Sequence, residues 1–175
     1  IGGKPIIWHI MKIYSFYGFN DFIICCGYMG YIIKEYFFNY SMHNSDIEID
    51  LKKNKLNVLK NVSEPWNVTL VDTGLSSNTG GRIKKIQPYI KENENFFLTY
   101  GDGLANVDIN KLFKEHEISK KIATVTSVKP IGRFGSIILN SDNNVKSFQE
   151  KTDGNDTWIN GGFFVLNYKV FNYIK

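Results

Sequence analysis

The sequence contains very few cysteines. Its two, Cys25 and Cys26, are adjacent in an apolar run, and neighbouring residues of a strand point to opposite faces, so the pair cannot easily form a disulfide. No third cysteine is present to pair with either one. We therefore expect two buried thiols in a reducing compartment, which predicts a cytoplasmic protein.

Several other features are scarce or missing. Arginine occurs only at Arg82 and Arg133, and the 19 lysines are scattered. No basic stripe carries interleaved aromatic residues, so we expect no nucleic-acid partner. No apolar stretch reaches the length of a membrane span, so we expect no membrane partner. His9, His43 and His116 have no partner at metal-ligand spacing, and no serine-protease or H-E-x-x-H pattern is present, so structural roles are favoured for the histidines.

What the chain does contain is typical of a globular α/β protein. At 175 residues, 43% hydrophobic and 15% aromatic, with a formal net charge of +4, it fits one domain over residues 1–175. Hydrophobic periodicity predicts helices at 6–14, 31–40, 82–90 and 108–118, strands at 22–26, 68–73, 96–100, 122–128 and 163–166, and hairpins at 47–59 and 135–149. Helices that alternate with strands predict a largely parallel sheet.

The segment from Tyr100 to Gly103 is the most informative part of the chain. It places Asp102 between Gly101 and Gly103, directly after an apolar strand. Ligands of open α/β sheets bind beyond the carboxyl ends of strands, and glycines let a ligand approach the backbone. Asp-Gly is also typical of a hairpin turn, but the residues that follow have helical periodicity. The pattern therefore favours a ligand site, in which the Asp102 carboxylate suits Mg²⁺.

A second polar loop connects the strand at 68–73 to the next helix. The loop contains Thr73, Ser77, Gly80 and Gly81 and ends at Arg82. Free backbone N–H groups at a helix start can seat a phosphate, although an ordinary capped helix has a similar composition. The loop is not a P-loop, because the Lys-Ser/Thr element is absent.

Three shorter segments could also contact a ligand. Arg133 lies in a glycine-bearing loop that ends at Gly135, where a planar bidentate donor would serve oxyanion recognition. Glu150 and Lys151 are adjacent at a strand end, although exposed charge pairs of this kind are common on surfaces. Asn160 precedes two glycines, a pattern that is also typical of a turn.

The motifs, taken together, resemble the sugar-nucleotidyltransferase family. The segments that carry the resemblance run in order along the whole chain: Gly2-Gly3-Lys4-Pro5, Glu64-Pro65-Trp66, Val71-Asp72-Thr73-Gly74, Thr79-Gly80-Gly81-Arg82, Gly101-Asp102-Gly103, Gly132-Arg133-Phe134-Gly135, Glu150-Lys151 and Asn160-Gly161-Gly162. The Gly-Asp-Gly and Glu-Lys elements occur across this family. The segment from Glu64 to Arg82 points to its cytidylyl branch.

The resemblance implies a fold, an activity and a set of site residues. The fold would be Rossmann-like, with three α/β/α layers around a mixed, mostly parallel sheet. The reaction would join CTP and α-D-glucose 1-phosphate into CDP-glucose and pyrophosphate with Mg²⁺, in the synthesis of bacterial surface polysaccharide. The implied roles are catalysis by Asp102 and Lys151, metal binding by Asp102, nucleotide binding by Thr73, Ser77, Gly80, Gly81, Arg82 and Gly101, and sugar binding by Gly135, Glu150, Asn160 and Gly162.

The resemblance also implies what lies around this segment. The family has a glycine-rich loop that we expect before Ile1, and a second metal-binding Asp that we expect after Lys175. We therefore expect the chain to be a fragment that is inactive alone, and, since the family tends to assemble, a homo-oligomer in its intact form.

Other functions remain open at this point. The same fold could use UTP or dTTP, or the chain could be a nucleotide-binding domain without catalysis. A glycosyltransferase that consumes a nucleotide sugar would normally need an Asp-x-Asp pair. Leu104 stands where the second aspartate would be, which argues against this function.

Overall fold

The computed structural model describes residues 1–129, 136–149 and 158–175. It divides into two compact units, the first formed by Ile1–Phe96 with Asn167–Lys175 and the second by Phe97–Leu166. A single domain over 1–175 stays a prediction.

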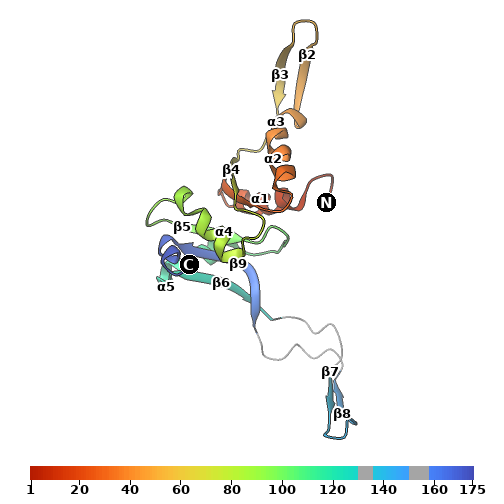
Figure 1. Ribbon diagram of the computed structural model, residues 1–175, viewed down its shortest axis with the longest axis vertical. Coiled ribbons are helices and arrows are strands. Elements are labelled where there is room, and N and C mark those ends of the chain that lie inside the picture. The colour runs from red at the N-terminus through yellow and green to blue at the C-terminus, as the bar shows by residue number, and fades with distance from the viewer. Residues whose placement is uncertain (130–135, 150–157) are drawn as a thin grey trace. The chain divides into compact units, whose positions relative to one another are not determined.

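The first unit contains most of the helices. Its elements are α1 (Ile6–Phe16), β1 (Asp21–Cys26), α2 (Gly30–Phe38), α3 (Tyr40–His43), β2 (Ser45–Asp50), β3 (Lys55–Asn61), β4 (Asn67–Asp72), α4 (Thr79–Lys85) and the 3-10 helices η1 (Gln87–Tyr89) and η2 (Tyr168–Asn172) (Figure 1). Pro88 lies in the first turn of η1, where its missing N–H costs nothing. The helix predicted to continue to residue 90 therefore ends at Lys85 and gives way to a 3-10 turn.

The strands β1 and β4 run parallel and bring two strand ends together. Their register pairs Asp21 with Asn67 and Cys26 with Asp72. The buried side chains around them include Ile10, Met11, Tyr14, Val71 and Ile83. Because parallel strands end at the same edge, the loops that follow Cys26 and Asp72 emerge side by side.

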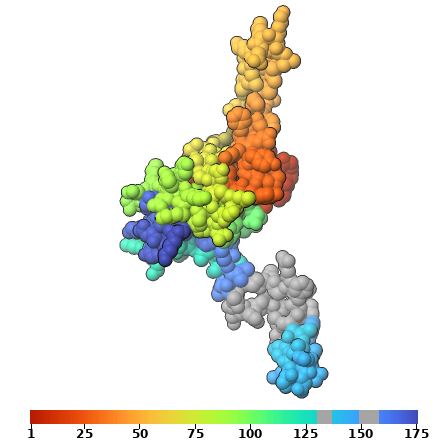
Figure 2. Space-filling model, viewed as in Figure 1, coloured from red at the N-terminus to blue at the C-terminus, as the bar shows by residue number. Residues whose placement is uncertain are grey.

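The strands β2 and β3 form the antiparallel hairpin that the sequence predicts. In Figure 1 they extend beyond α3 as a separate ribbon, and Figure 2 shows much of their surface uncovered. The register places Ile47 opposite Val58 and Ile49 opposite Leu56. Residues that face each other across a ladder share one side of the ribbon, so the hairpin has one apolar face.

The second unit is built around a three-stranded sheet with the strand order β5-β9-β6. Its elements are β5 (Asn95–Thr99, which begins in the first unit), α5 (Ile109–Ser119), β6 (Ala123–Val128), β7 (Ser136–Leu139), β8 (Val145–Gln149) and β9 (Ile159–Asn167). The Asp108 carboxylate caps α5 by accepting from Lys111 N at 2.9 Å, which satisfies a free donor at the helix start. The helix buries Ile109, Leu112 and His116.

The α/β class and its mixed sheets are confirmed, with two differences in detail. Among the strand pairs whose register is described, β1–β4 is parallel, whereas β2–β3, β6–β9 and β7–β8 are antiparallel. The last strand also begins at Ile159 instead of Phe163. Its glycines, predicted as a possible turn, lie inside the strand, where Gly162 has φ +82° and the β6–β9 register shifts between Val125 and Ser127. Glycine in a strand often marks such an irregularity.

Candidate active site

The loop after β4 is anchored to the end of β1 by Thr73. This residue is fully buried. Its backbone N–H and its hydroxyl both donate to Cys26 O, at 2.8 Å each. The hydroxyl also accepts a hydrogen bond from Arg82. A buried hydroxyl with two partners holds the loop in one position.

The guanidinium of Arg82 holds the same loop from the side of α4. Its Nη1 donates to Thr73 Oγ1 at 2.6 Å and to Gly74 O at 3.0 Å, and its Nη2 donates to Leu75 O at 3.3 Å. A Cβ on Gly27 would lie 2.4 Å from Arg82 Nη1, so a larger residue there would push the guanidinium away from this position. Three of the five N–H donors of an arginine are thus used, and the other two have no partner in the part of the chain that the structure describes.

Lys85 adds a second cation to the loop, and the sequence analysis missed it. Its Nζ donates to Thr73 O at 2.7 Å and to Ser77 Oγ at 3.1 Å. It lies three positions after Arg82 on α4, and this spacing puts two side chains on one side of a helix. Neither cation forms an ion pair with a described carboxylate. Two unpaired cations give the loop a positive local potential that favours an anion.

The two glycines of α4 have enough room around them for a Cβ atom. A Cβ on Gly80 would meet Ile174 Cγ2 at 3.6 Å, and a Cβ on Gly81 would meet Ser77 Cβ at 3.8 Å. Both distances are ordinary contacts, so packing within the chain does not require glycine at either position. The helix itself has only seven residues and no side-chain cap from Asn78. The charges of Arg82 and Lys85 therefore contribute more to the attraction of an anion than the helix dipole does.

Asp102 lies in an open turn after β5. The residues Tyr100 to Gly103 are exposed, and a Cβ on Gly101 or Gly103 would meet nothing within 4 Å. No described group donates a hydrogen bond to the Asp102 carboxylate. The next element is the helix α5, so the hairpin alternative is wrong. This carboxylate is free to take a ligand from outside the chain.

Asn160 lies at the start of β9, and its contacts include another residue that the sequence analysis missed. Its Nδ2 donates to Tyr100 Oη at 3.0 Å, and its Oδ1 accepts from Gly162 N at 2.8 Å. Tyr100 lies two residues before Asp102, and β5 and β9 are neighbours in the sheet. The second unit therefore brings Tyr100, Asn160 and Gly162 into one cluster near the Asp102 turn.

Four predicted positions lie outside the described residues: Arg133, Gly135, Glu150 and Lys151. The hairpin that separates the two segments is confirmed as β7–β8. The assignments of Gly135 to the sugar and of Glu150 and Lys151 to the sugar phosphate stay predictions.

A magnesium site at Asp102 fits the side chains that are present. The described residues contain no group of three or more His, Cys, Asp or Glu side chains that could hold a metal by themselves. The neighbouring Asp108 caps α5. Mg²⁺ is commonly held by one or two carboxylates together with substrate phosphates and waters, and a single exposed aspartate matches that donor set.

His9 and His116 contact groups within the chain, and the prediction that both thiols are buried holds for Cys26 but is wrong for Cys25. His116 is buried and its Nδ1 lies 2.8 Å from Thr124 Oγ1, and burial lowers its pKa below the usual 6.5. His9 Nε2 contacts Ile1 O at 2.9 Å. Burial raises the pKa of both thiols, which keeps them protonated at neutral pH and unreactive. Cys26 is buried, whereas Cys25 is only half-buried.

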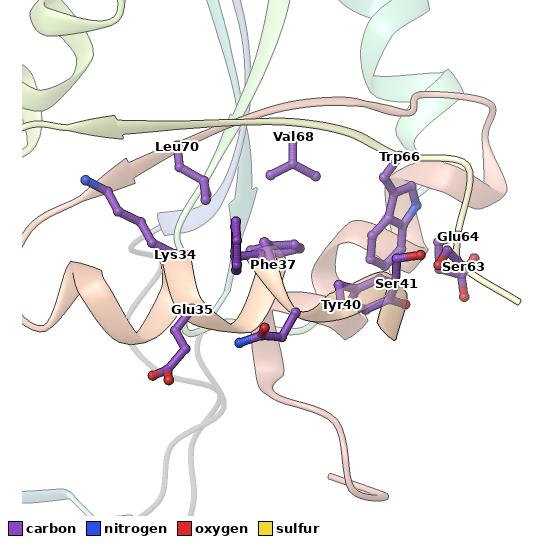
Figure 3. Close-up of a pocket in the computed structure, with 12 residues that line it drawn as sticks. Lys34, Glu35, Phe37, Tyr40, Ser41, Ser63, Glu64, Trp66, Val68 and Leu70 are labelled. Atoms are coloured by element: carbon purple, nitrogen blue, oxygen red, sulfur yellow. The ribbon is translucent and has the colours of Figure 1, made fainter. Parts of the chain in front are cut away.

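A separate apolar groove lies between the helices α2 and α3 and the strand β4. Its volume is about 890 Å³. Figure 3 shows Phe37 and Tyr40 on the helices facing Val68, Leu70 and Trp66. None of the predicted site residues lines this groove.

Among the described residues, no helix combines the length and the apolar composition that a membrane span requires.

Comparisons with known proteins identify the family of the chain. Residues 1–175 match the nucleotidyl transferase family. The chain is 54% identical over 174 residues to a glucose-1-phosphate cytidylyltransferase of Salmonella typhimurium and 45% identical to a probable glucose-1-phosphate cytidylyltransferase of Bacillus subtilis, covering 99% of this chain and 67% of each relative. The crystal structure of HddC from Yersinia pseudotuberculosis aligns with TM-score 0.61 and 21% identity over 98% of this chain and 66% of that one. The chain thus spans about two thirds of the length of its relatives, and it belongs to the nucleotidyl transferase family.

Proposed function

We propose that the intact protein transfers a cytidylyl group from CTP to α-D-glucose 1-phosphate and releases pyrophosphate. The observation that carries this proposal is the 54% identity, over 99% of the chain, to a glucose-1-phosphate cytidylyltransferase. The open Asp102 turn and the cationic loop at Thr73 supply the charges that such a reaction needs.

The chemistry requires alignment and charge neutralisation. The bond that forms joins a phosphate oxygen of the sugar phosphate to the α-phosphorus of CTP, and the bond that breaks releases pyrophosphate. The attacking oxygen is already ionised at neutral pH, so no general base is needed, and catalysis depends on in-line positioning and stabilisation of charge. A reaction of this kind needs no catalytic histidine or cysteine.

The nucleotide side of the site is assigned to the loop from Thr73 to Arg82. Arg82 and Lys85 fix the loop carbonyls and leave a positive field for the triphosphate. Ser77, Gly80 and Gly81 are proposed as nucleotide contacts of this loop, and Gly101 of the second unit is proposed as a further nucleotide contact. Asp102 would hold a divalent metal, proposed as Mg²⁺, which when bound neutralises charge on the phosphates.

The sugar side is assigned to Gly135, Glu150, Asn160 and Gly162, with Lys151 on the sugar phosphate. Lys151→Ala should mainly weaken the use of glucose 1-phosphate. Unchanged kinetics for that substrate would remove Lys151 from the site.

A homo-oligomer in the cytoplasm is part of the same proposal. The apolar face of the β2–β3 hairpin supports assembly, since Ile49, Leu56 and Val58 are 53%, 43% and 52% exposed. A two-stranded ribbon is only marginally stable in water without further packing. Sedimentation equilibrium of the intact protein would measure its oligomeric state, and a monomer would contradict this part.

Pyrophosphate release with different triphosphates tests the proposed function. The intact protein is incubated with glucose 1-phosphate, Mg²⁺ and one of CTP, UTP or dTTP. We expect kcat/KM for CTP to exceed that for the other two by at least about tenfold, the effect of a few hydrogen bonds to the base. A preference for UTP or dTTP would reassign the base, and no release with any triphosphate would favour a binding domain.

A further inference from the structure

Tyr100 lies next to two segments of the candidate site in the second unit, the Asp102 turn and Asn160 of β9. It follows β5 directly and lies two residues before Asp102. Its ring packs edge-on against Phe164, with ring centroids 6.0 Å apart and planes at 85°. The side chain is nevertheless exposed, since 41% of the residue is accessible. The ring is thus fixed on one side and open to a ligand on the other.

The Tyr100 hydroxyl sets the orientation of the Asn160 amide. It accepts a hydrogen bond from Asn160 Nδ2, while Asn160 Oδ1 accepts from Gly162 N. Both ends of the amide are therefore defined by partners within the chain. Asn160 Nδ2 keeps a second N–H that has no partner among the described residues. This oriented donor suits a hydroxyl or other oxygen of a sugar.

Gly162 completes this cluster for a steric reason. A Cβ at this position would lie 3.1 Å from Tyr100 Cδ2, and the residue has φ +82°. Both facts exclude a larger side chain without strain. The backbone of β9 can thus approach the tyrosine ring closely enough to place Asn160 under its hydroxyl.

We infer that Tyr100 is a positioning residue for the sugar phosphate, acting through the amide of Asn160. This inference rests on the proposed function, because it takes the sugar as the ligand beside Asn160. Loss of the hydroxyl would release the amide and weaken binding of the sugar phosphate, while the nucleotide side, built on Thr73 and Arg82, would be unaffected.

Tyr100→Phe in the intact protein tests this role, because it removes the hydroxyl and keeps the packed ring. We expect KM for glucose 1-phosphate to rise about three- to tenfold, the effect of one hydrogen bond, and KM for CTP to stay within twofold. Tyr89→Phe is the matched control, since Tyr89 is 54% exposed in η1 of the first unit, and it should leave both constants unchanged.

A double mutant separates positioning from general packing. If Tyr100 acts through Asn160, then Tyr100→Phe combined with Asn160→Ala should raise KM for glucose 1-phosphate no further than Asn160→Ala alone. Additive effects, or an unchanged KM in Tyr100→Phe, would overturn the inference. Calorimetric titration with glucose 1-phosphate should give the same order of affinities without turnover.

The outcome can be told apart from failure of the proposed function. If the parent protein prefers another triphosphate, the same measurements are made with that triphosphate and the inference stands or falls on KM for the sugar phosphate. If the parent neither turns over nor binds glucose 1-phosphate, both the function and the inference are wrong. An active parent with an unaffected Tyr100→Phe variant contradicts only the inference.

Discussion

The loop at Thr73 and the turn at Asp102 are both strand ends, but they differ in how far the chain satisfies their polar groups. Thr73 is buried and bonded to Cys26, and Arg82 and Lys85 donate to its hydroxyl and carbonyl. Asp102 is exposed, and none of the described groups donates to it. The first site is organised before any ligand binds, which lowers the cost of binding, whereas the second is left for a ligand to complete.

This difference predicts different consequences of mutation in the two sites. Changes at Thr73, Arg82 or Gly27 should disturb both the local structure and nucleotide binding. Changes at Asp102 should disturb catalysis and leave the fold intact.

The largest effect is expected from Asp102→Ala in the intact protein. Loss of the metal carboxylate should lower kcat by roughly 10²-fold or more, the scale seen when a charge-stabilising group is removed. The melting temperature should not change, since the side chain makes no described hydrogen bond. Pyrophosphate release and thermal unfolding measure the two quantities, and near-normal CDP-glucose formation would rule out the metal role.

A glycine pair tests the preorganised loop. In Gly27→Ala the new Cβ would meet the Arg82 guanidinium at 2.4 Å, and we expect a loss of about 1–3 kcal/mol from the free energy of unfolding, as for overpacked sites. In the control Gly81→Ala the nearest atom is Ser77 Cβ at 3.8 Å, and the change should stabilise α4 by roughly 0.5–1 kcal/mol. Equal stabilities of the two variants in urea unfolding would show that the Arg82 contacts contribute little.

A smaller effect is expected from Arg82→Lys. The substitution keeps the charge but removes the planar group that reaches Thr73, Gly74 and Leu75 together. We expect KM for CTP to rise about tenfold, the loss of one charged hydrogen bond, with KM for glucose 1-phosphate unchanged. Steady-state kinetics with each substrate varied in turn would detect this, and an equal rise in both constants would argue against a site on the nucleotide side.

The smallest effect concerns the core of the second unit and its dependence on pH. Burial lowers the pKa of His116 below 6.5, although Glu117 opposes this. The unfolded chain therefore binds the proton more readily than the folded chain. The contribution of His116 to the free energy of unfolding is complete above about pH 6.5 and is lost as the pH falls through the lowered pKa of the folded state. His116→Gln should flatten this part of the curve of unfolding free energy between pH 7 and 5. Parallel curves for the two proteins would contradict the assignment.

The strand ends and the carboxylate could be predicted from the sequence because they depend on local patterns. The apolar run before Gly101, the helical spacing after Asp108 and the alternation in the 47–59 hairpin each act within a few residues. Asp102 and the Thr73 loop followed from the rule that strand ends bind ligands.

The contacts that complete the two sites could not be predicted in the same way. Lys85 reaches Thr73 across a loop, Gly27 leaves space for a guanidinium from another element, and Tyr100 meets Asn160 across neighbouring strands. Each depends on tertiary packing between residues 12 to 60 positions apart, which local periodicity does not encode. The glycines of β9 were open to a turn interpretation for the same reason, since the nearest atoms to Gly161 belong to Thr126 and Val128 of the adjacent strand.

A crystal structure of the intact protein with CTP and magnesium tests the central claim most directly. We expect a carboxylate oxygen of Asp102 at about 2.1 Å from the metal, the distance typical of Mg²⁺–oxygen ligands, with the Arg82 contacts to Thr73 and Gly74 retained. A metal held without Asp102, and its carboxylate turned toward solvent, would contradict the account.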